Sequence, residues 1–400
     1  MTWTVIGESN FKRYFRKSIS KQYVKETRIA CFDNAIIVNE HERGFGVFDQ
    51  NFHFVKTSLQ VRKNNGQFIP KFNHDNIPYI DEDVVFIGNA YPHFGHFLLE
   101  HMNRLYALLD KKYKNRKVVL VNNKKLDVIP KYMFDLLELF GIKHNNIIIL
   151  DKTTRFRNVC VPEQGFNSRV YSSESFAQTF DRIAENIPDE EIYDKIYVSR
   201  AKLDKLHKTL GEEKVQHVFE KNGFKIIYPE KLPLQTQIAL VKNCKVLAGC
   251  AGTALHLALF MKPGGTVISI KRNRRPACNA MIQNNVNNTK HLDGIFISGS
   301  IETAKTFHST NAPQIIAVNQ YMQEFFDEYG YKYTDKDLGV DSDAWQEYKV
   351  ALDEYNETHG QAFIRKIKRF FIKYSSLFVL GRERRGRYRK WLKNKLNFKK

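Results

Sequence analysis

The stretch VVFIGNAYPHFGHFLLEHMNRLYALLDKKYKNRKVVLVNN, residues 84–123, decides the fold class. It begins with an apolar run at residues 84–89 that predicts a buried strand, and residues 94–111 then repeat apolar side chains at helical spacing. A second apolar run at residues 117–123 predicts another strand. A strand, a helix and a strand in this order predict a parallel βαβ unit.

The alternation continues on both sides of this unit. Short antiparallel strands are predicted within residues 30–40 and 44–61, and a helix at 129–141 precedes a strand at 146–150. After a polar stretch at 162–176 the pattern restarts, with strands at 195–200, 224–229, 245–249 and 266–271 and helices at 211–222, 234–243 and 253–262. We therefore expect two Rossmann-like domains, residues 1–170 and 171–340, followed by helices and a tail at 341–400.

The composition fits a globular protein of this size. The chain has 400 residues, of which 42% are hydrophobic, and two domains are the default at this length. Its five cysteines are scattered without a CxxC pair, which argues against a disulfide framework or a zinc ribbon and favours a reducing compartment. The first residues lack the apolar core of a secretory signal, and no window has the roughly 18 apolar residues of a membrane span. We expect a cytoplasmic protein.

The positive charge is concentrated at one end of the chain. The formal net charge is +20, and residues 361–400 carry fifteen Lys and Arg against a single Glu. Apolar residues recur at helical spacing within 363–374, so the tail predicts a basic amphipathic segment suited to an anionic membrane surface. Packing of its first helix on the body is the alternative. A nucleic-acid-binding protein is another alternative, although such proteins usually spread positive charge over a recognition domain, and no nucleic-acid partner is expected.

Three titratable side chains stand at the start of the helix predicted at 94–111. His93, His96 and Glu100 are spaced i, i+3 and i+7 and follow directly after a strand, where α/β sheets bind their ligands. A histidine or a glutamate at this place can take a proton from a substrate hydroxyl. The alternative is that these groups only cap the helix. No HExxH spacing and no second His/Cys cluster are present, so no metal site is expected.

A turn of small residues precedes the helix predicted at 253–262. Gly249, Gly252 and Thr253 leave the backbone N–H groups at the start of that helix open to an anionic group such as a diphosphate. Neither the dinucleotide fingerprint GxGxxG nor the phosphate loop GxxxxGK[ST] is present. Tight packing between strand and helix is the alternative reason for these residues.

In their order and spacing, these segments resemble glycosyltransferase family 61, which includes bacterial capsule and lipopolysaccharide transferases. The resemblance covers residues 85–270 and rests on HFLLEHMNRLYALL from His96, on YVSR at 197–200, and on the run from Gly223 through GTALHLALF to KPGGTVISI. Ala251 and Leu257 depart from residues common in the family. His256 is similar to bacterial variants with a Ser-Ala-Leu-His helix, and Glu212 is the nearest match to a family Asn-Glu pair.

The resemblance implies a GT-B fold, in which two Rossmann-like domains face a central cleft. It implies inverting transfer from a nucleotide sugar, with a UDP-sugar expected, to a hydroxyl of a glycan or glycolipid acceptor, without a metal or other cofactor. The implied base is His96 or Glu100, and the implied acceptor-side residues are His93 and Arg104. The implied donor-binding residues are Arg200, Lys205, Gln237, Gly249, Gly252, Thr253 and His256. A catalytically inactive glycan-binding module is a further alternative.

Overall fold

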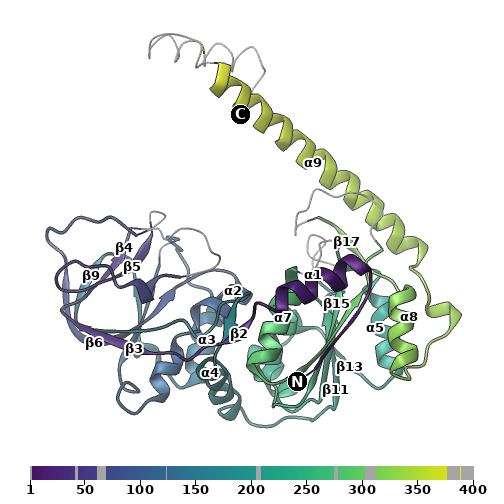
Figure 1. Cartoon of the computed structure of the whole chain (residues 1–400), viewed down its shortest axis with the longest axis horizontal. Coiled ribbons are helices and arrows are strands. Elements are labelled where there is room, and N and C mark those ends of the chain that lie inside the picture. The colour runs from purple at the N-terminus through teal and green to yellow at the C-terminus, as the bar shows by residue number, and fades with distance from the viewer. Residues whose placement is uncertain are drawn as a thin grey trace.

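The computed structural model describes residues 2–40, 44–60, 69–122, 124–203, 209–273, 278–301, 312–375 and 388. The protein is a mixed α/β structure with parallel strands in both of its large sheets. Figure 1 shows the two sheets at opposite ends of the body, with helices α2, α3 and α4 between them. The α/β class expected from the sequence is confirmed.

The first sheet has seven strands, in the order β5-β4-β9-β6-β7-β8, with β3 also paired to β9. Strands β6 to β9 are parallel to one another, whereas β3, β4 and β5 run antiparallel to their neighbours. The strands are β3 (Ile29–Asp33), β4 (Ile36–Asn39), β5 (Phe45–Phe48), β6 (Tyr79–Asn89), β7 (Lys117–Val121), β8 (Ile147–Leu150) and β9 (Thr154–Pro162), and helix α3 spans Lys131–Phe140. Strand β9 was not predicted.

The second sheet has six parallel strands in the order β1-β16-β15-β14-β11-β13. They are β1 (Trp3–Ile6), β11 (Lys195–Val198), β13 (Lys225–Ile227), β14 (Val246–Cys250), β15 (Thr266–Lys271) and β16 (Asp293–Ser298). The accompanying helices are α1 (Ser9–Ile19), α5 (Glu212–Lys221), α6 (Leu234–Lys242), α7 (Cys278–Thr289) and α8 (Gln320–Glu328). Because β1 pairs with β16, the first residues of the chain complete the sheet of the second half, which a division at residue 170 did not anticipate.

Each sheet has a point at which the order of its parallel strands reverses. In the second sheet, β13 lies on one side of β11 and the next strand, β14, lies on the other. In the first sheet, β7 and β9 flank β6 in the same way. Ligands of open α/β sheets bind outside the carboxyl ends of strands at such switch points. A ligand is therefore expected beside the segments that follow β6, β11 and β14.

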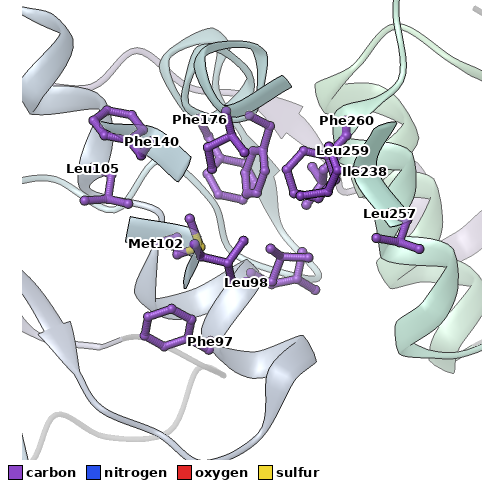
Figure 2. Packing of buried hydrophobic residues seen from close by; sticks show 14 of the residues in the cluster. Phe97, Leu98, Met102, Leu105, Phe140, Phe176, Ile238, Leu257, Leu259 and Phe260 are labelled. Carbon is purple, nitrogen blue, oxygen red and sulfur yellow. The ribbon is translucent and has the colours of Figure 1, made fainter. Parts of the chain in front are cut away.

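The two halves share one apolar core. It includes Phe97, Leu98 and Met102 from the segment after β6 and Leu257, Leu259 and Phe260 from the segment after β14 (Figure 2). Helix α4 (Glu174–Glu185) lies between them through Phe176 and Phe180, and the rings of Phe180 and Phe260 are 5.3 Å apart. Because this core is continuous, it fixes the position of one switch point relative to the other.

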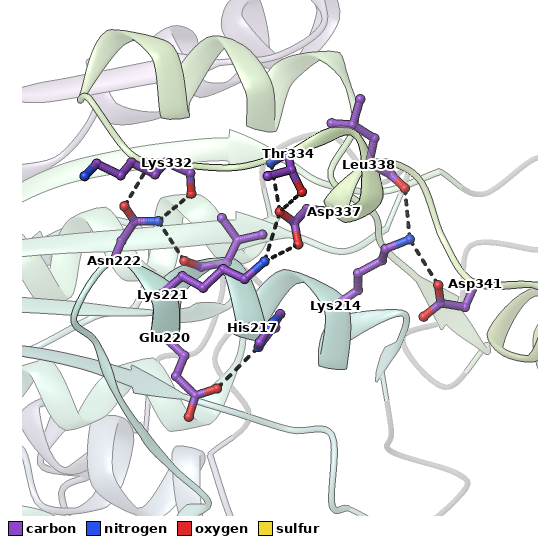
Figure 3. Close-up of polar contacts among 11 residues, drawn as sticks. Lys214, His217, Glu220, Lys221, Asn222, Lys332, Thr334, Asp337, Leu338 and Asp341 are labelled. Atoms are coloured by element: carbon purple, nitrogen blue, oxygen red, sulfur yellow. Dashed lines mark hydrogen bonds and ion pairs between the residues drawn. The ribbon is translucent and has the colours of Figure 1, made fainter.

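The C-terminal helix α9 (Ser342–Ser375) begins on the body and then leaves it. Trp345, Tyr348 and Leu352 pack beside the short pair β12 (Thr209–Leu210) and β17 (Gln314–Ile315). The segment before α9 is held to α5 by ion pairs of Lys221 with Asp337 at 2.9 Å and of Lys214 with Asp341 at 3.0 Å (Figure 3). In Figure 1 the later part of α9 points away from both sheets. None of the helices in the described ranges combines the length and the apolar character needed to cross a membrane.

One pair of cysteines corrects an expectation from the sequence. Cys31 and Cys160 form a disulfide, with their Cα atoms 4.0 Å apart. They meet because the antiparallel pairing of β3 with β9 sets these two residues opposite each other. The scattered cysteines argued against a disulfide framework and favoured a reducing compartment, but residues 129 positions apart in sequence become neighbours once the strands pair. Cys244 and Cys250 are free and buried.

Candidate functional site

The segment after β6 is helical but less regular than the sequence predicts. It consists of α2 (Phe94–His96), a π-helical turn η3 (Phe97–His101) and a 3₁₀ helix η4 (Leu105–Leu109). The predicted single α-helix over 94–111 is therefore wrong in geometry, since π turns rotate the following residues out of register and often occur at functional sites. His93 caps α2, where its Nδ1 accepts a hydrogen bond from the backbone N–H of His96 at 3.3 Å. For His93, the capping alternative fits this structure.

His96 and Glu100 form a side-chain pair across the π turn. His96 Nδ1 lies 3.1 Å from Glu100 Oε1, and the His96 side chain is 42% exposed while that of Glu100 is 10% exposed. A carboxylate oxygen accepts hydrogen bonds, so Nδ1 carries the proton and Nε2 keeps its lone pair. The carboxylate also stabilises the imidazolium that forms when Nε2 takes up a proton. This geometry suits His96 as the proton acceptor and Glu100 as the group that orients it.

Beside this pair, α2 from the half that contains the first sheet packs against a segment from the half that contains the second sheet. Gly95 is buried, and a Cβ atom at this position would lie 2.8 Å from both Cγ2 and Oγ1 of Thr253. Only glycine therefore allows α2 to lie so close to the 3₁₀ helix η7 (Thr253–Phe260). His93 and His96 lie near enough to His256 on η7 for their charges to add to the lowering of its pKa. The structure thus brings the predicted residues His93, His96, Thr253 and His256 together from two distant parts of the chain.

The two glycines of the small-residue turn have different surroundings. A Cβ atom at Gly249 would lie 2.7 Å from the Val198 backbone oxygen, so this glycine serves close packing of β14 on β11, the alternative that the sequence left open. A Cβ atom at Gly252 would instead lie 3.6 Å from Arg200 Nη1 and 3.4 Å from Arg272 Nη2. Two guanidinium groups therefore meet beside Gly252, the chemistry that binds phosphate groups.

Arg272 was not among the residues predicted from the sequence. It follows the last residue of β15, and its Nε donates a hydrogen bond to the Ala251 carbonyl at 2.8 Å. The available signal was a basic residue directly after a predicted strand. Without the strand order, however, nothing indicates that this strand lies next to the one that ends at the turn.

Glu212 holds the backbone of Arg200 in place through a hydrogen bond. It is fully buried at the start of α5, and its Oε1 accepts hydrogen bonds from the Arg200 backbone N–H at 3.1 Å and the Tyr197 hydroxyl at 3.2 Å. Burial raises the pKa of Glu212 to about 7, although the hydrogen bond and the charge of Arg200 both act to lower it. The sequence identified Glu212 only as a weak match to a family motif, and the structure makes it a positioning residue for Arg200.

The raised pKa of Glu212 predicts a pH-dependent stability. Because the folded protein holds this proton more tightly than the unfolded chain, the contribution is fully present below the usual Glu pKa and is lost as the pH rises through about 7. Glu212→Gln removes the ionisation, so the midpoint of thermal unfolding of the variant should rise relative to wild type between about pH 5 and pH 8. Glu213→Gln, an exposed neighbour on α5, is the control. A difference that does not change with pH would contradict this role.

Two other predicted residues, Arg104 and Gln237, bind backbone carbonyls away from this junction. Arg104 is fully buried and donates hydrogen bonds to the carbonyls of Thr57, Leu59 and Pro162 at 2.8–2.9 Å, so here it ties backbone segments together rather than facing an acceptor. Burial lowers its pKa to about 10. Gln237 donates from Nε2 to two carbonyls, those of Pro229 at 2.7 Å and Leu232 at 2.9 Å, and holds the turn before α6. Lys205 lies outside the described residues.

Comparison with known families identifies the class of enzyme. Residues 94–268 match the family described as Glycosyltransferase 61. The protein therefore contains a glycosyltransferase family 61 domain. The matched range contains His96, Glu100, Arg200, Gly252 and His256, so both sides of the junction fall within a glycosyltransferase enzyme domain. No curated protein is similar enough to the chain to count as a match. In the part of the chain that the structure describes, no three His, Cys, Asp or Glu side chains are grouped so as to hold a metal ion.

Proposed function

We propose that this family 61 enzyme is an inverting glycosyltransferase that moves a sugar from a nucleotide sugar, expected to be a UDP-sugar, to a hydroxyl of a capsule or lipopolysaccharide glycan. The observation that carries the proposal is the meeting of two kinds of group at one junction. The His96–Glu100 pair of the first half lies where α2 packs on η7, and Arg200 and Arg272 of the second half meet beside Gly252 at the start of η7.

The chemistry divides between these groups. Nε2 of His96 takes the proton of the acceptor hydroxyl while the hydroxyl oxygen forms a bond to the anomeric carbon of the donor sugar. The bond from that carbon to the diphosphate oxygen breaks, and its electron pair stays on the diphosphate. Arg200 and Arg272 stabilise the negative charge that develops there. Attack from the face opposite the diphosphate inverts the anomeric carbon.

A GT-B arrangement is consistent with this division of roles. His96 follows the switch-point strand of the first sheet, and the two arginines follow strands at and beside the switch point of the second. In such an arrangement the second half holds the donor and the first half holds the acceptor. The support for this assignment is that the base-like pair and the cationic pair come from different sheets and meet where α2 contacts η7.

An assay with the purified full-length protein tests this function. The protein is incubated with UDP-, GDP- and CMP-sugars, with and without EDTA, and nucleotide release and the anomeric form of the product are measured. We expect release from at least one donor, inversion at the anomeric carbon and full activity in EDTA, because guanidinium groups supply the positive charge. Loss of activity in EDTA and its rescue by manganese would contradict the metal-independent mechanism. Glycan binding without release from any donor would favour an inactive binding module.

We also propose that the basic tail holds the enzyme on the cytoplasmic face of an anionic membrane, beside a lipid-linked acceptor. Residues 382–400 carry ten Lys and Arg against Glu383 alone, and nearby cations contribute on the order of 1 kcal/mol each to binding at such a surface. These residues lie outside the described part of the chain, except for Tyr388. The support from the described part is that α9, which leads to them, points away from the body.

Co-sedimentation with lipid vesicles tests whether the basic tail binds an anionic membrane. We expect the full-length protein to bind vesicles that contain anionic lipid, to bind less as salt is raised, and to lose most of this binding when truncated after residue 378. The truncated protein should still transfer sugar to a soluble acceptor, because the junction of α2 and η7 is unaffected. Equal partitioning of the two forms would contradict the proposal, and salt-sensitive binding to RNA but not to vesicles would indicate a nucleic-acid partner.

A further inference from the structure

A second histidine at the junction has a different partner from His96. His256 lies on η7, is 9% exposed, and its Nδ1 is 3.2 Å from Gln283 Oε1 on α7. Thr253 and His256 are three residues apart in a 3₁₀ helix, where side chains at i and i+3 lie on the same side. Because Thr253 contacts Gly95, this side of η7 faces α2. His256 therefore stands opposite the segment that carries His96.

The Gln283 amide cannot be turned around. Its Nε2 donates hydrogen bonds to the Leu255 carbonyl at 3.2 Å and to Asn287 Oδ1 at 3.0 Å. A backbone carbonyl only accepts, so the nitrogen of the amide must face Leu255 and the oxygen must face His256. Gln283 is 2% exposed, so water does not offer an alternative arrangement.

This orientation fixes the tautomer of His256. An amide oxygen accepts hydrogen bonds, so Nδ1 of His256 must carry the proton that it donates to Gln283. In the neutral ring the other nitrogen, Nε2, then has a free lone pair on the side away from Gln283. Burial lowers the pKa of His256 to about 4, the Gln283 hydrogen bond acts against this, and the nearby His96 and His93 add to the lowering.

His96 and His256 thus have hydrogen-bond partners of different charge. His96 is backed by a carboxylate, which stabilises the charged ring, whereas His256 is backed by a neutral amide, which does not. Two like groups with different hydrogen-bond partners commonly divide the roles in a reaction. His96 is the one suited to take up a proton, and His256 is the one suited to stay neutral.

We propose that Gln283 holds His256 as the neutral Nδ1–H tautomer, so that Nε2 is a fixed hydrogen-bond acceptor for a hydroxyl or an amide N–H of the donor sugar. This inference rests on the proposed function. His256 follows the Gly252–Thr253 turn on the same short helix, so a sugar attached to a diphosphate at that turn lies within its neighbourhood. If the sugar carried a carboxylate opposite Nε2, two hydrogen-bond acceptors would face each other and repel. The site therefore disfavours a carboxylate at this one position of the sugar, and Gln283, outside the matched family range, is a positioning residue.

Histidine tautomers are read directly by nitrogen NMR of the protein without substrate, so this test does not depend on activity. We expect His256, assigned by its loss in His256→Leu, to be the neutral Nδ1–H form at neutral pH. In Gln283→Leu this preference should disappear. Gln237→Leu is the matched control, since this glutamine also donates to two partners, both of them backbone carbonyls, and should leave the His256 signals unchanged. A protonated ring or an Nε2–H tautomer in the wild-type protein would overturn the proposal.

Donor kinetics then test the role of the lone pair. His256→Leu removes the acceptor and should lower kcat/KM for the donor by about 10- to 100-fold, as expected for one buried hydrogen bond. His256→Gln keeps an oxygen acceptor and should recover part of this loss. Equal losses in both variants, or no loss in either, would overturn the role in sugar binding. Absence of transfer by the wild-type protein would instead count against the proposed function, while the tautomer result would stand on its own.

Discussion

Replacing His96 by alanine should lower sugar transfer by about 10²-fold or more at saturating donor and acceptor, without unfolding the protein. The reason is that His96 has the arrangement of a general base, with Nδ1 bonded to Glu100 at 3.1 Å and a 42% exposed side chain. Steady-state rates and a thermal unfolding curve measure the two parts of the expectation. Glu100→Gln keeps an acceptor for Nδ1–H but removes the negative charge, so its loss should be smaller than that of His96→Ala.

His93→Ala is the matched control for this prediction. His93 is also a histidine of the same segment, but its Nδ1 caps α2 by accepting the His96 N–H. Loss of a cap costs about 1 kcal/mol of stability, so the expected change is in the unfolding midpoint more than in the rate. Near-normal rates for both His96→Ala and Glu100→Gln would show that this segment is structural and that the base lies elsewhere.

Replacing Arg200 by alanine should lower kcat/KM for the donor by about 10²- to 10³-fold, the range found when a charge-stabilising donor is removed from an active site. Arg200 and Arg272 both lie beside Gly252, where the diphosphate is proposed to leave. Arg200→Lys keeps the charge but loses the planar fork, so it should fall between the alanine variant and wild type. Donor kinetics and titration with the free nucleoside diphosphate measure the effect.

Arg182→Ala, an exposed arginine on α4, is the control for a general loss of positive charge. It should leave donor kinetics unchanged. If Arg200→Ala and Arg272→Ala both bound the nucleoside diphosphate as tightly as wild type, the diphosphate would have to lie away from the Gly252 turn.

The parts of the fold that the sequence predicted well are those in which local pattern and burial agree. Strands β7 and β14 are runs of mostly buried apolar residues and were predicted within two residues of their bounds, and the buried half of β6, residues 84–89, was predicted without the polar residues that begin the strand. Strand β9 escaped prediction because Arg155, Arg157 and Asn158 interrupt its apolar residues. Strand β1 was missed for another reason. It is short, and the strand it pairs with, β16, lies almost 300 residues away in the sequence.

The residues of the candidate site likewise include some that local sequence pattern predicted and some that only the tertiary structure brings together. His96 and Glu100 are four residues apart, so local spacing predicted that they share one helical face, and the structure pairs their side chains at 3.1 Å. Arg272 and Gln283 meet Gly252 and His256 only through the strand order and the packing of α7 on η7, which local pattern does not contain. Arg104 shows another limit of local pattern, because it was named an acceptor-side candidate only for its place beside the predicted site. Three carbonyl groups from distant segments instead draw it into the interior.

The central claim is that one half supplies the base and the other half holds the donor. Single-turnover transfer combined with donor titration, using the donor that wild type accepts, separates these roles in the two variants. We expect His96→Ala to bind the donor as tightly as wild type but to transfer its sugar about 10²-fold more slowly, and Arg200→Ala to bind the donor more weakly. Tight donor binding together with wild-type transfer in His96→Ala, or donor binding unaffected in Arg200→Ala, would contradict the claim.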